Sequence, residues 1–244
     1  MSGELVVKVS WGPRPESPLE LAERWTATLG RLTELSAGKP VVWRRDVDGG
    51  GVGDLVPDKA EDFAAVVEAG GPEEDADIIG WSAAVVGRWP DGGYAYVRAK
   101  GGGSDEYTPF TATLQLFPAP ELGSAVGAGS AAPFSDRLPE ALAALAESWE
   151  PDTGLTYDRE LFRTVKAAFG LRNSQPRCGW STYLSANRAT LVPEELPGPR
   201  HATADGGLVL NAGHSTEAVM AAHRILTDAG ALEPLPVPAP RPTW

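Results

Sequence analysis

Three β-rich runs in the middle of the chain restrict the fold more than any other feature of the sequence. They cover residues 78–89, 94–99 and 108–117, and glycine-rich turns separate them. Turns of this length join antiparallel neighbours, so the runs predict a β-meander. In the third run, Ala112, Leu114 and Leu116 alternate with polar residues, which is typical of a strand with one buried face.

A helix with a complete start signal precedes the meander. Ser17 can cap the helix, Pro18 suits its first position, and Glu20 three residues after the cap completes a capping box. Apolar residues at spacings of four, four and three then define one face of the helix: Leu21, Trp25, Leu29 and Leu32. This spacing predicts that one side of the helix packs against the core.

Further helices and strands are expected on both sides of the meander. Strands are predicted at 5–9, 41–44, 179–184 and 207–210, and helices at 58–69, 158–169, 216–229 and from Pro139 onward. Residues 48–57 hold four glycines and predict a mobile loop. Helices grouped around antiparallel strands indicate the α+β class, with a central antiparallel sheet and flanking helices.

The chain is expected to form a single α+β domain over residues 1–233. Residues 118–133 are small and turn-rich, and they are the candidate division if the domain consists of two similar-sized α+β halves. Residues 234–244 contain five prolines and predict an extended tail.

Cysteine usage and hydropathy predict a cytoplasmic protein. Cys178 is the single cysteine, so no disulfide can form within the chain. The first residues have neither the basic nor the apolar region of a secretory signal. No window reaches the roughly 18 to 20 apolar residues that a membrane-spanning helix needs.

Negative charge is concentrated in one short stretch. Residues 46–77 contain eleven acids and one lysine, so they carry −10 of the net charge of −12. Such a field repels nucleic acid and anionic membranes and attracts a basic partner. A solvated surface that only keeps the chain soluble is the alternative interpretation.

The reactive residue types do not form a recognisable active site. His201, His214 and His223 lack the paired helical spacing of a zinc hydrolase, and we expect each at the surface or at a cap. Cys178 has no partner motif and predicts a buried, inert thiol. The sequence therefore predicts no catalytic residue, no metal site and no cofactor, and a protein that is not an enzyme.

Two blocks and the ending of the chain carry a family resemblance. The first block is residues 11–17, followed by the capped helix and Trp43, and the second is residues 179–184. The ending has a strand opened by two glycines, then a helix, then residues 228–232. Together they resemble immunity protein 52, a family of immunity proteins of bacterial polymorphic toxin systems. The motif residues are Trp11, Gly12, Arg14, Glu16, Trp43, Gly179, Trp180 and Tyr183.

The resemblance implies an α+β fold without catalytic activity or cofactor. It also implies a cognate toxin, typically a nuclease of the restriction-endonuclease type. We interpret Trp11 and Trp43 as core residues, and Arg14 and Glu16 as a local pair at the start of the helix.

These observations lead to the hypothesis of an immunity protein that neutralises its toxin by direct protein–protein binding. A nuclease cleft is basic because it holds phosphate, so a negative surface favours the encounter. The acids expected to contribute are Asp58, Glu61, Asp62, Glu73, Glu74 and Asp75. The alternatives are an enzyme with a carboxylate-based site on the central strands, and a structural or assembly protein of a secretion-like system.

Overall fold

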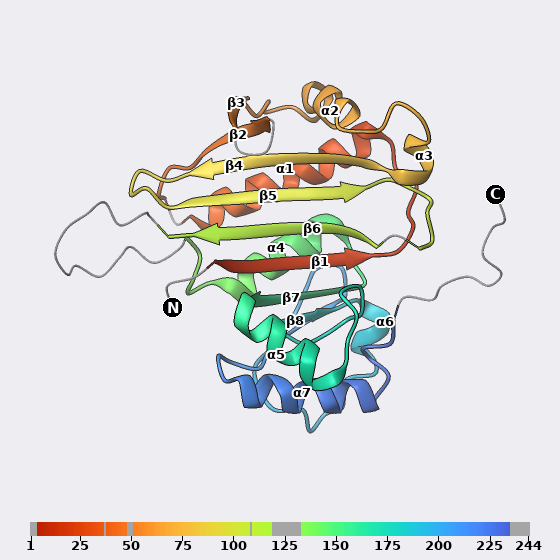
Figure 1. The fold of residues 1–244 in the computed structure, drawn as a ribbon. Coiled ribbons are helices and arrows are strands. Elements are labelled where there is room, and N and C mark those ends of the chain that lie inside the picture. The colour runs from red at the N-terminus through yellow and green to blue at the C-terminus, as the bar shows by residue number, and fades with distance from the viewer. Residues whose placement is uncertain (1–3, 37, 48–50, 108, 119–132, 235–244) are drawn as a thin grey trace.

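The strands of the computed structural model, which describes residues 4–36, 38–47, 51–107, 109–118 and 133–234, form one sheet. Its order is β3-β2-β4-β5-β6-β1-β7-β8-β10-β9, and neighbouring strands are antiparallel throughout (Figure 1). The strands are β1 (Leu5–Trp11), β2 (Val42–Val47), β3 (Gly51–Leu55), β4 (Trp81–Arg88), β5 (Tyr94–Gly101), β6 (Phe110–Phe117), β7 (Thr153–Asp158), β8 (Ser181–Leu184), β9 (Arg200–Ala202) and β10 (Leu208–Asn211). The predicted α+β class with a central antiparallel sheet is confirmed.

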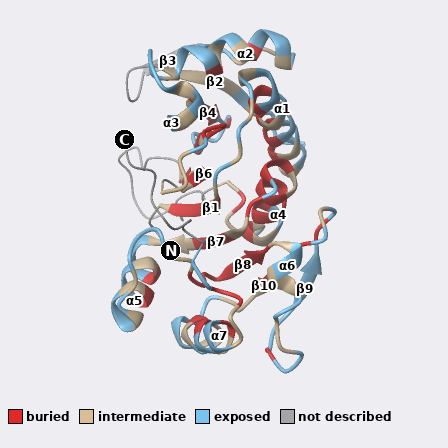
Figure 2. Cartoon of the chain, turned by 90° about the vertical axis from the view of Figure 1, so that its right-hand side faces the viewer, coloured by how far each residue is buried: buried red, intermediate tan, exposed pale blue. Residues whose placement is uncertain are grey.

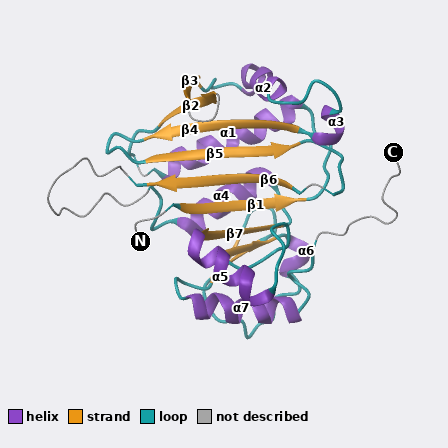
Figure 3. Ribbon diagram, viewed as in Figure 1, coloured by secondary structure: helices purple, strands orange, loops and turns teal. Residues whose placement is uncertain are grey.

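Helices lie behind the long strands and at both ends of the sheet in the view of Figure 3. They are α1 (Pro18–Leu35), α2 (Ala60–Ala69), α3 (Ala76–Ile79), α4 (Leu138–Trp149), α5 (Arg159–Phe169), α6 (Ala186–Ala189) and α7 (Thr216–Asp228). Figure 2 shows α1 and α4 along one side of the sheet and α5 on the other. No helix in the described ranges is long and apolar enough to cross a membrane.

The predicted meander is present as β4, β5 and β6, but its first strand begins later than expected. Residues 78–80 are not strand: α3 ends at Ile79, and Gly80 adopts a φ of 83°. A Cβ at Gly80 would come within 2.4 Å of the Gly101 carbonyl oxygen, so glycine is required for both conformation and space. β4 therefore starts at Trp81.

Helix α1 begins as its sequence predicts. The Ser17 hydroxyl accepts a hydrogen bond from the Glu20 backbone N–H, and the Glu20 carboxylate accepts one from the Ser17 N–H at 2.7 Å. All four predicted inward residues are buried. Trp25 packs edge to face on Trp149 of α4, with ring centroids 5.9 Å apart, so α1 and α4 share one aromatic core.

Besides the short edge strand β9, which pairs with β10, two strands lie where the sequence predicted none. The expected loop at 48–57 contains β3, which pairs with β2 across a register shift between Arg44 and Asp46. Arg44 donates to the Gly53 carbonyl at 3.2 Å and supports that irregular hairpin. β7 lies between two helices in the sequence and is paired to β1 on one side and β8 on the other. The positions of β3 and β7 are set by the strands they pair with rather than by a local sequence pattern.

The sheet is continuous from β3 to β9, with β1 at its middle. Most of the candidate division, residues 119–132, lies outside the described residues, as do residues 235–244 of the predicted tail. The single-domain organisation remains a prediction.

Candidate protein-binding site

The six predicted acids lie at one end of the molecule, around α2 and the segment that leads to α3. We call them the acidic surface, and all six are exposed: Asp58, Glu61, Asp62, Glu73, Glu74 and Asp75. α2 turns Phe63 and Val67 into the core, where Phe63 meets Trp25 edge to face at 5.9 Å. Because these two positions fix the inner side of α2, the charged positions remain in solvent.

The acidic surface has two groups that the length of α2 separates. Three acids come before or at the start of α2, and three follow it; a ten-residue helix is about 15 Å long. Figure 1 shows α2 and α3 at the same end of the molecule as β2 and β3. Among the described residues, none of the six acids takes part in an ion pair, and no acid, His and Cys cluster could hold a metal ion. The charge is therefore left for an external partner or for solvent.

An apolar groove borders the acidic surface. It lies between α1, β2, β3 and the start of α2, has a volume of about 570 Å³, and reaches Asp58 at its rim. Leu55 and Val42 line it and remain 58% and 47% exposed. Exposed apolar side chains in a concave site are the features that anchor a ligand or a protein segment. This groove was not predicted from the sequence, although Leu55-Val56 interrupts the glycine-rich stretch with apolar residues.

Trp43 connects the groove to the core. Its indole N–H donates to the Thr33 hydroxyl at 2.9 Å, and its ring meets Trp89 edge to face at 6.0 Å. The Trp43 ring packs directly on Gly87. A Cβ at position 87 would lie only 2.4 Å from an atom of that ring. Trp43 is thus only partly buried: it packs against the core and also forms one wall of the groove.

The first block of motif residues fixes the start of α1. Trp11 is buried and stacks on Trp149 at 5.3 Å. Arg14 Nε lies 3.0 Å from Glu16 Oε2, an ion pair as predicted, although its angles are poor for a hydrogen bond. Glu16 also accepts a hydrogen bond from Arg24 Nε at 2.6 Å, and the Gly12 N–H donates to an Asp152 carboxylate oxygen at 3.1 Å.

The second block is equally internal. Trp180 and Tyr183 are buried, and the Tyr183 hydroxyl donates to Asp205 at 2.5 Å. A Cβ at Gly179 would come within 2.1 Å of the Thr156 carbonyl oxygen, so only glycine permits this approach of the chain to β7. The contacts of both motif blocks are structural, and the structure does not bring these residues to the acidic surface.

Cys178 and His223 are neighbours in the interior. The thiol is buried as predicted, and burial raises its pKa to about 12, so it stays protonated at neutral pH. His223 is 2% exposed, which corrects its expected surface or capping position. Its Nδ1 accepts a hydrogen bond from the Cys178 backbone N–H at 3.4 Å and not from the thiol. Burial, with the nearby Arg177 and Arg224, lowers the pKa of His223 to about 4. His201 and His214 are exposed.

Comparison with known proteins gives a fold and no family. No protein-family model and no curated protein matches the sequence. A solved structure of the Pseudomonas aeruginosa T6SS protein PA0821 is similar, with a TM-score of 0.51 and 12% sequence identity. The similarity covers 96% of this chain and 79% of that chain. The two proteins share a fold. The resemblance to immunity protein 52 stays a prediction.

Proposed function

We propose that the chain is a cytoplasmic immunity protein that neutralises a cognate bacterial toxin, a nuclease, by direct binding rather than by catalysis. The observation that carries the proposal is the apolar groove with exposed Leu55 and Val42 beside uncompensated carboxylates. The fold shared with a T6SS protein supports a role connected with secretion.

The two parts of this surface suit different steps of binding. A nuclease cleft is basic because it must hold phosphate, so the acidic surface speeds the encounter and selects the partner. Charge at the rim contributes little to residence time, whereas apolar side chains that lose their water on contact do. We therefore assign the association rate to the acidic surface and the dissociation rate to the groove.

The test is a kinetic measurement against the toxin encoded beside this gene. Changing the six acids of the acidic surface to Asn or Gln should slow association at least about tenfold at low salt and much less at high salt. The control variant removes six exposed acids from the C-terminal half and makes the same change in net charge. These acids are Glu160, Glu194, Glu195, Glu217, Asp228 and Glu233. Equal association rates for the two variants would remove the acidic surface from the proposal.

A second variant tests the groove. Leu55→Ser should accelerate dissociation about five- to thirtyfold, as for a residue whose truncation costs about 1 to 2 kcal/mol, with little change in association. Leu191→Ser, at another exposed leucine (46% exposed), is the matched control. If the parent protein neither binds the toxin nor blocks its nuclease activity, the proposed function is wrong.

A further inference from the structure

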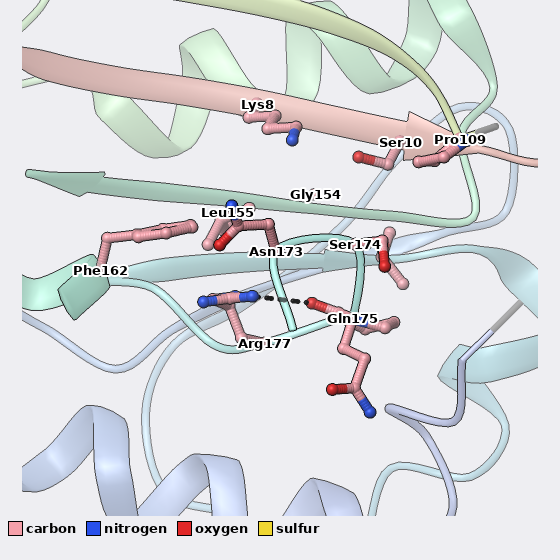
Figure 4. A pocket seen from close by; sticks show the side chains of 12 residues that line it. Lys8, Ser10, Pro109, Gly154, Leu155, Phe162, Asn173, Ser174, Gln175 and Arg177 are labelled. Carbon is pink, nitrogen blue, oxygen red and sulfur yellow. Dashed lines mark hydrogen bonds between the residues drawn. The ribbon is translucent and has the colours of Figure 1, made fainter. Parts of the chain in front are cut away.

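Two cations face a small cavity on the side of the sheet opposite α1 and α4. Lys8 reaches it from β1 and Arg177 from the segment after α5, and Asn173, Ser10 and Thr153 supply polar atoms around it (Figure 4). The cavity measures about 30 Å³. This site is separate from the acidic surface and the groove, and no step of the proposed function uses it.

Arg177 is buried with part of its hydrogen-bonding capacity unused. Its side chain is almost completely covered, at 4% exposure, and the guanidinium carbon lies 4.2 Å from the centre of the Phe162 ring. Nη2 donates to the carbonyl oxygens of Arg172 and Gln175, the latter at 3.4 Å (Figure 4). Nη1 has no hydrogen-bond partner among the described residues. A buried N–H group of a charged side chain is costly when nothing accepts from it.

Lys8, which is partly buried, is the second cation of the cavity. Burial and the positive charge of Arg177 lower its pKa. Within the described part of the chain, neither Lys8 nor Arg177 has a carboxylate at ion-pair distance. Glu4, near the start of β1, instead accepts a hydrogen bond from the Gln115 amide. One buried and one partly buried cation beside a cavity, without a carboxylate at ion-pair distance among the described residues, form an arrangement that an anion would stabilise.

Asn173, an exposed residue of the cavity lining, adds a donor. Its side-chain oxygen accepts a hydrogen bond from Lys166 Nζ at 2.8 Å, which leaves its amide N–H groups for another partner. The cavity therefore offers the ammonium of Lys8, the free Nη1 of Arg177 and an amide. Its volume is enough for two or three oxygen-sized atoms, since one water needs about 10 to 15 Å³.

We propose that this cavity binds a single carboxylate group through Lys8, Arg177 and Asn173. A carboxylate has two oxygens that can accept from these donors and suits the small volume, whereas phosphate carries four oxygens and is the larger anion. The carboxylate comes either from a free small acid or from an acidic side chain on a docked protein segment, and the chemistry of the site is the same for both.

Thermal unfolding of the full chain at pH 7 tests the site. Sodium acetate should raise the Tm by about 2 to 4 °C above sodium chloride at equal concentration, because a ligand of the folded state alone stabilises it. Lys8→Met keeps an unbranched side chain that is one heavy atom shorter and removes the charge, and it should abolish the acetate increment. Lys100→Met, on β5, which β6 separates from β1, and outside the cavity lining, should retain it.

Further experiments identify the source of the carboxylate and control for variants that fail to fold. A short glutamate-containing peptide that raises the Tm when acetate does not assigns the site to a protein segment, and the reverse result assigns it to a free acid. Arg177→Lys should weaken the response; if it fails to fold, Lys8→Met and a ¹³C-acetate NMR titration decide. An equal rise in the parent and Lys8→Met, a response to phosphate larger than to either carboxylate, or no response at all would overturn the proposal.

Discussion

The acidic surface and the start of α1 both carry charged side chains, but they differ in the contacts that those side chains make. The six acids near α2 are exposed, and none is in an ion pair among the described residues. At the start of α1, Glu16 is 7% exposed and contacts both Arg14 and Arg24. Arg24 also reaches Glu150 at 2.9 Å, next to the last residue of α4. Charged side chains that link elements of the fold contribute to its stability, whereas charged side chains without such contacts are available to bind a partner.

The largest expected effect concerns His223, a buried titratable group. If the exposed acids do not support the fold, internal groups such as this one should dominate the pH dependence of stability. The folded pKa of His223, about 4, lies below its ordinary 6.5, so the unfolded state binds the proton more readily between these values. Stability should therefore fall as pH decreases from about 6.5 to 4, by about 3 kcal/mol. Urea unfolding of parent and His223→Gln should show a flatter dependence in the variant. His201→Gln, an exposed site, should follow the parent; the opposite pattern would assign the acid sensitivity elsewhere.

The next effect tests the network at the start of α1. Glu16→Gln keeps the shape of the side chain but leaves Arg14 and Arg24 without their central negative charge. We expect a loss of about 2 kcal/mol, below the roughly 3 to 5 of a fully buried pair because both arginines are partly exposed.

Glu150→Gln supplies the control for the network, because that carboxylate is 59% exposed and, among the described residues, forms an ion pair with Arg24 alone. The change should reduce the free energy of unfolding by less than about 1 kcal/mol. Equal losses for the two variants would show that position in the network does not matter.

The smallest expected effect belongs to the acidic surface. Changing Glu73, Glu74 and Asp75 to their amides should alter the free energy of unfolding by less than about 0.5 kcal/mol, because no described contact is lost. Asp75 has a φ of 58°, a left-handed conformation that Asn also tolerates. A loss above 1 kcal/mol in denaturant unfolding would mean that these acids support the fold, and the contrast between the two regions would break down.

Local signals predicted the elements that depend on neighbours in sequence. The Ser17–Glu20 capping box is one example, and the alternation along β6 is another. β7 was missed because its place is set by pairing with β1, roughly 150 residues earlier in the chain. β3 was missed because glycines obscure the strand pattern, and its pairing with β2 is irregular.

The site was predicted only in part for the same reason. The acids stand out in sequence, but the groove is assembled from three separate segments, within residues 26–34, 41–43 and 55–63. The spacing of His223 from its apolar neighbours does predict that it is buried. It lies four residues after Val219 and three before Leu226, the spacing that marked the inner face of α1. A polar residue on an apolar stripe is expected to face the core.

The central position of β1 has a consequence for synthesis. β1 is the first described strand to leave the ribosome, yet Leu5 pairs with Leu116 and Asp158. Until both later strands have emerged, a nascent chain holds an apolar strand with two unpaired edges. Such a segment is prone to pair wrongly or to associate with other chains. Native pairing of β1 on both edges therefore waits until β7 has been made.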